Sequence, residues 1–137
     1  MVLVDTSVWI RFLANRALYA AELDRLLGLD DVTGHELVYG ELLIGDRGGR
    51  RNLLAAYERM HQTAMVPHHD VVAFVRDRSL HGRGMGWVDV HLLASAIVGR
   101  LQLWTADPSF AAVAGQFGVA YKVPAPKPRE ARPRSQT

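Results

Sequence analysis

The sequence predicts an α/β fold with a central, mostly parallel sheet that is flanked by helices. Short apolar runs suited to strands alternate along the chain with segments long enough to be helices. A parallel pair of strands needs such a long crossover connection, so the alternation favours a parallel sheet. The 137 residues, 49% apolar and 22% charged, suit one globular unit rather than two domains or a disordered chain.

The order of elements follows from apolar spacing and from turn residues. The run after Met1 ends at Asp5, and Thr6 or Ser7 can cap the helix that follows. Strands are expected at residues 2–4, 31–33, 64–67, 101–104 and 119–123. Further helices are expected at about residues 18–28, 35–44, 53–60, 69–80, 87–98 and 108–116. Glycines and arginines at 45–51 predict an exposed basic loop.

The domain is expected to span residues 1–123, and the proline- and arginine-rich residues 124–137 are expected to form a disordered tail. The tail holds four basic residues against Glu130, a net charge of +3. Since the whole chain carries +2, the body is near −1 (2 − 3), so overall charge is no argument for nucleic-acid binding.

Composition also limits the location of the protein and its chemistry. No apolar run approaches the roughly 20 residues that span a bilayer, and an acid interrupts the N-terminal run where a signal peptide would be apolar. We therefore expect a cytoplasmic protein without membrane association. The chain has no cysteine, so a metal would bind through oxygen or imidazole.

Four acidic residues occupy positions that suggest a shared site. Asp5 and Asp107 follow predicted strands, and ligands of open α/β sheets bind beyond the carboxyl ends of the strands. Asp89 shares the apolar stripe of its helix with residues three and four positions later. Glu41 has apolar neighbours at the same offsets. Both side chains are expected to point toward the core.

Each acid also has a structural interpretation, which these residues leave open. Asp5 could be a turn residue or a helix cap, and Asp107 could be an ordinary N-cap. Asp89 could compensate a helix dipole, and Glu41 could pair with an arginine of the following loop. The combination favours a metal. Two carboxylates about 4 Å apart repel each other by about 4 kcal/mol at an effective dielectric near 20, and a divalent cation relieves this repulsion.

Other polar residues carry weaker signals. His68, His69 and Asp70 suggest a zinc site, but neighbouring helix positions do not face one another. His91 lies on a different helix face from Asp89 and is expected to be a polar surface residue. Glu36 lies near a helix N-terminus, where a structural role suffices.

Four motifs in this order resemble the PIN-domain ribonucleases, and in particular the toxin half of VapBC toxin–antitoxin pairs, over about residues 2–123. They are VLVDTSVWI with Asp5, the helix end GELLIG with Glu41, WVDVHLLASA with Asp89, and LWTADPSF with Asp107. The resemblance implies a PIN-like three-layer fold and a metal-dependent endoribonuclease that cleaves RNA with activated water.

The resemblance also implies roles for particular residues. Asp5 and Asp89 would be the principal ligands of Mg²⁺, or of Mn²⁺. Glu41 would hold or orient metal-bound water, and Asp107 would complete a second metal position. The supporting polar neighbours would be Thr6, Ser7 and Thr105.

Partners follow from the same resemblance: an RNA substrate, a cognate VapB-type antitoxin and a homodimer. An acidic pocket repels phosphate, so RNA contacts are expected from nearby cations. The candidates are Arg47, Arg50, Arg51 and Arg83. Apolar residues left exposed by the core could form the protein interfaces, and the candidates are Trp9, Tyr19, Leu23, Leu26 and Leu27.

Two alternatives come from other functional classes. An aspartyl-phosphate domain also places an acid after its first strand, but the phosphatase pattern has a second acid where this chain has Ser7. A PIN-like module that binds RNA or protein without catalysis is the other alternative. The presence of all four acids argues against it.

Overall fold

The fold is built on a small parallel sheet. The computed structural model describes residues 1–125. Its strands are β1 (Val2–Val4), β2 (Val32–Thr33) and β3 (Gln102–Trp104), in the order β2-β1-β3. Both pairings of the central strand β1 are parallel, with Val2 opposite Val32 and Leu3 opposite Leu103. The expected α/β class with a parallel sheet is confirmed.

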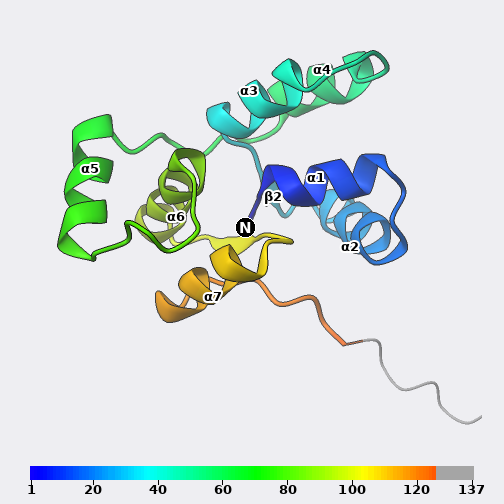
Figure 1. The fold of residues 1–137 in the computed structure, drawn as a ribbon. Helices are drawn as coiled ribbons and strands as arrows, with labels where there is room; N and C mark the ends of the chain where they lie inside the picture. Colours follow the sequence, from blue (N-terminus) through cyan, green and yellow to red (C-terminus); the bar gives the residue numbers. More distant parts are fainter. Residues whose placement is uncertain (126–137) are drawn as a thin grey trace, which may run out of the picture.

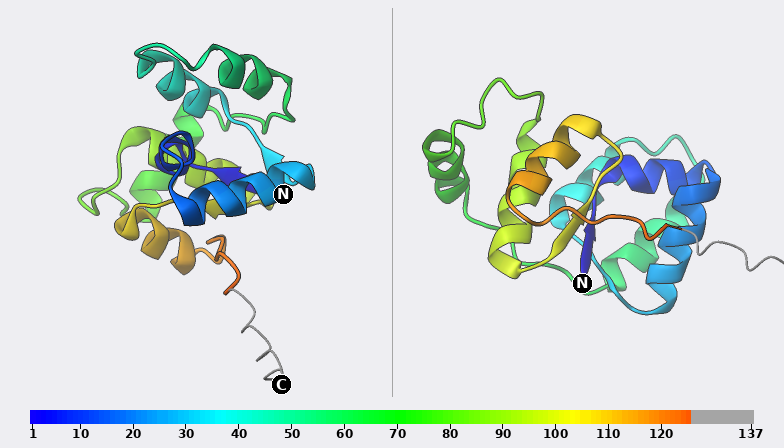
Figure 2. Two further views of the ribbon diagram at one scale, coloured as in Figure 1. Left: turned by 90° about the vertical axis from the view of Figure 1, so that its right-hand side faces the viewer. Right: turned by 90° about the horizontal axis from the view of Figure 1, so that it is seen from below.

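Seven helices among the described residues surround this sheet (Figure 1). They are α1 (Thr6–Leu13), α2 (Ala17–Gly28), α3 (Glu36–Ile44), α4 (Arg51–Arg59), α5 (His68–Asp77), α6 (Trp87–Gly99) and α7 (Pro108–Gln116). The helices α3 and α4 form a hairpin whose loop lies far from the sheet. In the right-hand view of Figure 2, α6 and α7 lie on one side of the strands and α1 and α2 on the other.

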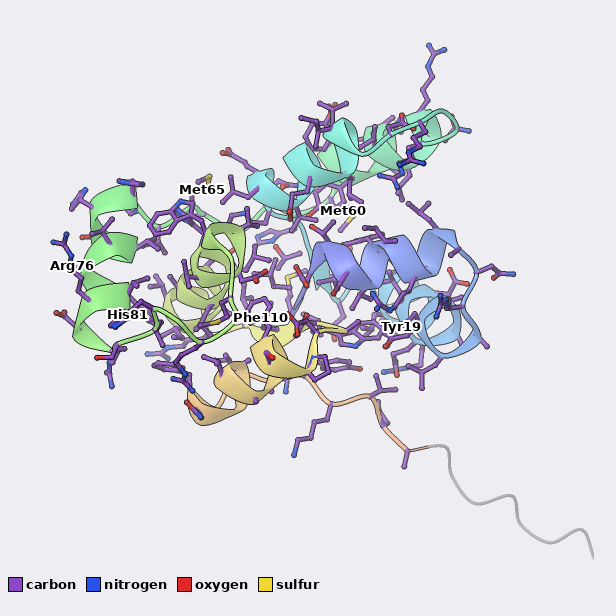
Figure 3. All side chains as sticks on the ribbon, in the orientation of Figure 1. Tyr19, Met60, Met65, Arg76, His81 and Phe110 are labelled. Atoms are coloured by element: carbon purple, nitrogen blue, oxygen red, sulfur yellow. The ribbon has the colours of Figure 1, made fainter. Side chains whose placement is uncertain are left out.

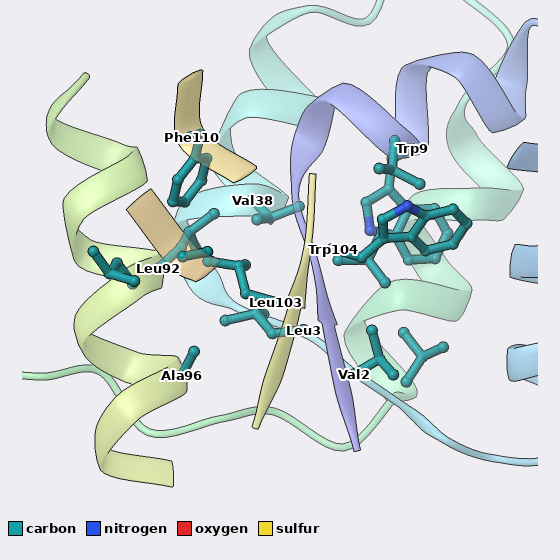
Figure 4. Close-up of a cluster of buried hydrophobic side chains, with 14 of the residues drawn as sticks. Val2, Leu3, Trp9, Val38, Leu92, Ala96, Leu103, Trp104 and Phe110 are labelled. Carbon is teal, nitrogen blue, oxygen red and sulfur yellow. The ribbon is translucent and has the colours of Figure 1, made fainter. Parts of the chain in front are cut away.

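Alternation along the strands divides the core between these two helical layers. Successive side chains of a strand point to opposite faces. Leu3 and its neighbour Leu103 lie toward the side of Leu92 on α6, whereas Trp104 lies on the side of Trp9 on α1 (Figure 4). All five are buried, so both faces of the sheet are covered, and the central strand β1 is apolar throughout.

Two predicted strands are wrong. Residues 64–67 form no ladder, because the pairing beside β2 is confined to hydrogen bonds of Gly34 with His61 and Thr63, and Pro67 has no N–H to donate. Residues 119–123 form one isolated bridge, between Ala120 and Leu103, because β3 itself is only three residues long.

The predicted tail lies almost wholly outside the described residues, so the domain boundary at 123 stays a prediction. Within residues 1–125, no helix is both long enough and apolar enough to cross a membrane.

Candidate functional site

Asp5 lies where β1 ends and α1 begins, at the carboxyl edge of the sheet. Its backbone N–H donates to the carbonyl of Trp104 on β3, which anchors this junction to the neighbouring strand. The side chain is 5% exposed, and its Oδ2 accepts hydrogen bonds from Ser7 Oγ at 2.7 Å and Thr105 Oγ1 at 2.8 Å. The two hydroxyl donors thus satisfy a carboxylate oxygen that is largely removed from water.

Ser7 and Thr105 also organise the loop that carries Asp107. Ser7 Oγ accepts from the N–H of Ala106 at 3.0 Å, and Thr105 Oγ1 accepts from the N–H of Asp107 at 3.1 Å. Each hydroxyl therefore uses both its donor and its acceptor capacity, and together they join the end of β1 to the loop after β3. The structure brings these two expected neighbours into direct contact with Asp5.

Asp107 is the N-cap of α7. Its Oδ1 accepts from the N–H of Ser109 at 3.0 Å, and Pro108 occupies the first turn, where its missing N–H costs nothing. The N-cap interpretation is thus correct. The second carboxylate oxygen remains available for another ligand, so capping and metal binding are compatible.

Asp89 lies in the first turn of α6, and its Oδ2 accepts from the N–H of Gly86 at 2.9 Å. The side chain is half-buried. Burial raises the pKa of Asp89, the hydrogen bond from Gly86 opposes this shift, and the negative charges of Asp5, Asp107 and Glu41 raise the pKa further. The four acids therefore form one electrostatic unit, although they come from four separate segments.

Glu41 corrects one prediction, because its side chain is exposed and does not point into the core. The buried residues of α3 are Val38 and Leu42, whereas Ile44 is 89% exposed. The buried stripe is thus displaced by one residue from the one expected. Glu41 stands beside it and accepts a 2.7 Å hydrogen bond from Thr6 Oγ1. Within the described part of the chain, no basic side chain forms an ion pair with it.

The donor set fits a hard divalent cation. All four acids offer oxygen, the ligand that Mg²⁺ and Mn²⁺ prefer, and the charges of the other three acids add to the effect of burial in raising the pKa of Asp89. Over residues 1–125, no three acidic or histidine side chains are close enough to hold one ion by direct contacts alone. Magnesium usually keeps several waters and takes only one or two protein carboxylates, so the set remains suitable.

His91 corrects a second prediction, since it is 4% exposed and not a surface residue. The ring packs edge-on against Trp87 with 5.0 Å between centroids. Burial, and then the charge of His68, lower its pKa. In the described part of the protein its Nδ1 has no hydrogen-bond partner. The suggested zinc site gains no support, because His69 and Asp70 are exposed and pair only with each other.

His35 is a polar core residue that the sequence did not single out. It is fully buried as the N-cap of α3, where Nδ1 accepts from the N–H of Leu37 and Nε2 lies 3.1 Å from Ser95 Oγ. Burial, and to a smaller extent His91, lower its pKa from 6.5 to about 4. Histidine is not a common N-cap, so only its position just before the apolar spacing of α3 could have indicated it.

The four candidate arginines do not form one surface. Arg50 donates to the carbonyl of Leu42 at 2.9 Å and so caps the end of α3. Arg47 is exposed in the α3–α4 connection, and Arg51 is exposed at the start of α4. Arg83 lies in the loop before α6 and donates to Gln116 at 2.7 Å.

The family model described as PIN domain matches residues 2–116 of this sequence. The chain belongs to the PIN domain family. Ribonuclease VapC32 of Mycobacterium tuberculosis, in strains CDC 1551 / Oshkosh and ATCC 25618 / H37Rv, is 44% identical over 121 residues, which are 88% of this chain and 95% of that protein. The expected class, a PIN ribonuclease of the VapC type, is confirmed by this match.

Solved structures agree with the fold of this PIN domain. The structure titled "Crystal Structure of FitAcB from Neisseria gonorrhoeae" has a TM-score of 0.59 and 26% identity, and the match covers 88% of this chain and 95% of that one. The structure titled "Structure of FitAB bound to IR36 DNA fragment" has a TM-score of 0.60 and 26% identity, with 88% and 92% covered. The expected PIN-like architecture is confirmed.

Proposed function

We propose that this PIN domain is a metal-dependent endoribonuclease, the toxin of a toxin–antitoxin pair, which acts on RNA in the cytoplasm. The observation that carries the proposal is the group of four acids around the carboxyl edge of the sheet, in which burial and then the charges of Asp5, Asp107 and Glu41 raise the pKa of Asp89. The match to a ribonuclease over most of both chains supports it.

Asp5 and Asp89 would be the principal ligands of Mg²⁺ or Mn²⁺, with Glu41 and Asp107 beside them. The cation, when bound, makes water nucleophilic near neutral pH and stabilises the leaving oxygen of the phosphodiester. No cysteine, serine or histidine nucleophile is needed for this chemistry.

The polar neighbours of the acids hold the carboxylates in fixed orientations. Ser7 and Thr105 occupy Oδ2 of Asp5, and Thr6 fixes Oε1 of Glu41. The N–H of Gly86 similarly holds one oxygen of Asp89. Each carboxylate thus keeps one oxygen engaged with the protein and presents the other to a cation. Such preorganisation spares the site the entropy of ordering its ligands.

Phosphate contacts would come from cations around this acidic site. Arg47 and Arg51 have exposed side chains, and Arg83 lies on the loop that precedes Asp89. Neutralising a residue that contacts phosphate lowers the slope of log K against log[salt] by about one unit. An unchanged slope would remove that arginine from the RNA site.

An antitoxin is the partner that the VapC-type relatives suggest, and a second copy of the chain is the partner that the sequence resemblance implies. The candidates named from the sequence are wrong in part, because Trp9, Leu23 and Leu26 are buried in the core. Other apolar side chains are exposed, among them Ile10, Leu13, Leu18, Leu43 and Ile44 on α1, α2 and α3. These residues are better candidates for a protein interface.

The decisive experiment is cleavage of a pooled structured RNA by antitoxin-free protein, with Mg²⁺ and with EDTA, together with an Asp89→Asn variant. Asp77→Asn is the matched control, since Asp77 is an exposed helical acid outside the site. We expect cleavage by the wild type and the control in Mg²⁺, and none in EDTA or by Asp89→Asn. Calorimetric titration with Mn²⁺ should show weaker metal binding by Asp89→Asn alone. RNA binding without cleavage by the wild type would instead favour a non-catalytic module.

A further inference from the structure

Trp87, the first residue of α6, is a tryptophan exposed at the surface. Its exposed fraction is 44%, whereas those of Trp9 and Trp104 are 1% and 3%, and the chain has three tryptophans in all. Leaving a large aromatic ring half in water forgoes much of the stabilisation that its burial would provide. Such a ring is well suited to binding a planar or apolar ligand.

One side of Trp87 faces a hollow of about 120 Å³ between α5, α6 and the loop that joins them. The walls are mainly apolar and include Leu80, Met85 and Val90, while His81 adds a polar ring that can donate or accept a hydrogen bond. Figure 3 labels His81 in the loop that leads from α5 to α6. The hollow therefore offers an aromatic wall, apolar walls and one hydrogen-bonding group.

The indole is held in place by two histidines. His91 packs edge-on against Trp87 at 5.0 Å, with 86° between the ring planes, and His68 lies 5.2 Å away between centroids. His91 comes from the same helix, one turn later, and is buried. A ring supported in this way is preorganised, so a ligand that stacks on it loses little entropy in ordering it.

Gly86 links the hollow to the acidic site. This glycine lines the hollow, and its N–H donates to Asp89. Arg83, on the same loop, donates to Gln116 and adds a positive charge to this loop. A polynucleotide whose phosphate lies at the four acids therefore has a neighbouring nucleotide within reach of Trp87.

Charge distinguishes this hollow from two others. The hollow between α3 and α4 is lined by Glu36 and Glu58, and the hollow between α5 and α6 that lies farther from the acidic site includes Asp70. Carboxylates repel the phosphates on either side of a base. No acidic side chain is among the described residues that line the hollow of Trp87.

We propose that Trp87 and this hollow form a nucleobase-binding subsite, in which an unpaired base of the RNA stacks on the indole next to the cleaved phosphodiester. Single-stranded bases stack on aromatic side chains with little dependence on base identity, and His81 at the hollow provides base-edge discrimination. This inference rests on the proposed ribonuclease function, because it assigns part of the substrate of that same site.

The test uses the intrinsic fluorescence of the full chain in EDTA, titrated with short single-stranded oligoribonucleotides and with matched oligonucleotides that carry abasic sites. Because Trp9 and Trp104 are buried, quenching on binding reports mainly on Trp87. Affinity is measured independently by anisotropy of end-labelled RNA. The variants are Trp87→Leu, which removes the aromatic face, and Trp87→Phe, which keeps one. Val98→Ala trims another exposed apolar residue of α6 as a control.

We expect quenching by RNA but much less by the abasic oligonucleotides. Trp87→Leu should lose roughly 5- to 150-fold in affinity, the equivalent of about 1–3 kcal/mol per stacked base, whereas Trp87→Phe should retain most of it and Val98→Ala all of it. Thermal melting of each variant separates lost stacking from lost folding. If the Trp87→Leu variant folds poorly, the comparison of RNA with abasic RNA on the wild-type protein still tests the subsite.

Tight binding without quenching, with equal affinity for the abasic RNA, overturns the subsite while the ribonuclease proposal stands. Cleavage of RNA by a Trp87→Leu variant at the wild-type rate and KM also overturns it, and would leave the exposed indole to a protein partner. Absence of any RNA binding and cleavage by the wild type instead refutes the proposed function itself.

Discussion

Acidification should destabilise this protein through His35. Its ring is fully buried, and its Nδ1 accepts the N–H of Leu37 and so must be unprotonated. Nε2 can then donate to Ser95, 3.1 Å away. A proton on Nδ1 would break the cap of α3 and place a charge inside the core, which explains why burial lowers the pKa to about 4.

The sign and the size of this pH effect follow from the difference in the pKa of His35 between the folded and the unfolded chain. The unfolded chain binds a proton at this histidine near pH 6.5 and the folded chain only near pH 4, so stability from His35 is complete above pH 6.5 and is lost as the pH falls. At 1.36 kcal/mol per pKa unit, the free energy of unfolding falls by about 2 kcal/mol between pH 7.5 and 5.0, and by about 3 kcal/mol in all. The lowered pKa of His91 acts in the same direction, whereas the raised pKa of Asp89 opposes it.

Urea denaturation at pH 7.5 and 5.0, in EDTA, measures this change for the wild type and for His35→Asn. Asparagine caps helices well and does not titrate in this range, so the variant should start less stable at pH 7.5 but lose about 2 kcal/mol less on acidification. His69→Asn is the control, because that side chain is 83% exposed. Parallel losses in the wild type and in His35→Asn would refute the assignment of the pH dependence to His35.

Three further predictions concern the site and the core. Asp89→Asn should abolish cleavage. It should also raise the free energy of unfolding in EDTA at pH 7.5, because the raised pKa of Asp89 means that its ionised carboxylate destabilises the fold. Equal or lower stability of this variant in urea would contradict this prediction. Thr105→Val should lower the rate of cleavage, and it should lower the free energy of unfolding by about 1–3 kcal/mol. The reason is that Asp5 loses a hydrogen-bond donor and the N–H of Asp107 loses its acceptor. Unchanged kcat and stability would show that these hydrogen bonds are dispensable. Leu3→Ala should cost about 2–5 kcal/mol by thermal or urea unfolding, because this side chain is fully buried at the centre of the sheet, and a loss below 1 kcal/mol would mean that the core relaxes around it.

The parts of the fold that sequence could predict are those with a local cause. The run Val2–Val4 before Asp5 predicts the central strand because both faces of that strand are buried. Asp107 before Pro108 similarly predicts the start of α7 from the needs of a helix N-terminus. Strand position and helix caps were therefore enough to bring two of the four acids to the same edge of the sheet.

The predictions were wrong where packing against a distant segment determines which side chains are buried. Which side of α3 is buried depends on its packing against α1 and α4, so Glu41 was assigned to the wrong side although its neighbours were read correctly. The contact of His91 with Trp87 follows from their spacing of four residues on α6, but that spacing does not show that His91 is only 4% exposed. The bond from Gly86 to Asp89 is local, but glycine has no side chain that would indicate it.

The hydrogen bond between Thr105 and Asp5 joins residues that lie 100 positions apart in the chain. During translation, Asp5 emerges from the ribosome long before the strand and the loop that hold its carboxylate have been made. A nascent chain shorter than about 100 residues lacks β3, Thr105 and Asp107, and so lacks both the third strand and one of the four acids. If the four acids form the proposed catalytic site, the order of synthesis completes that site only after almost the whole domain has been translated.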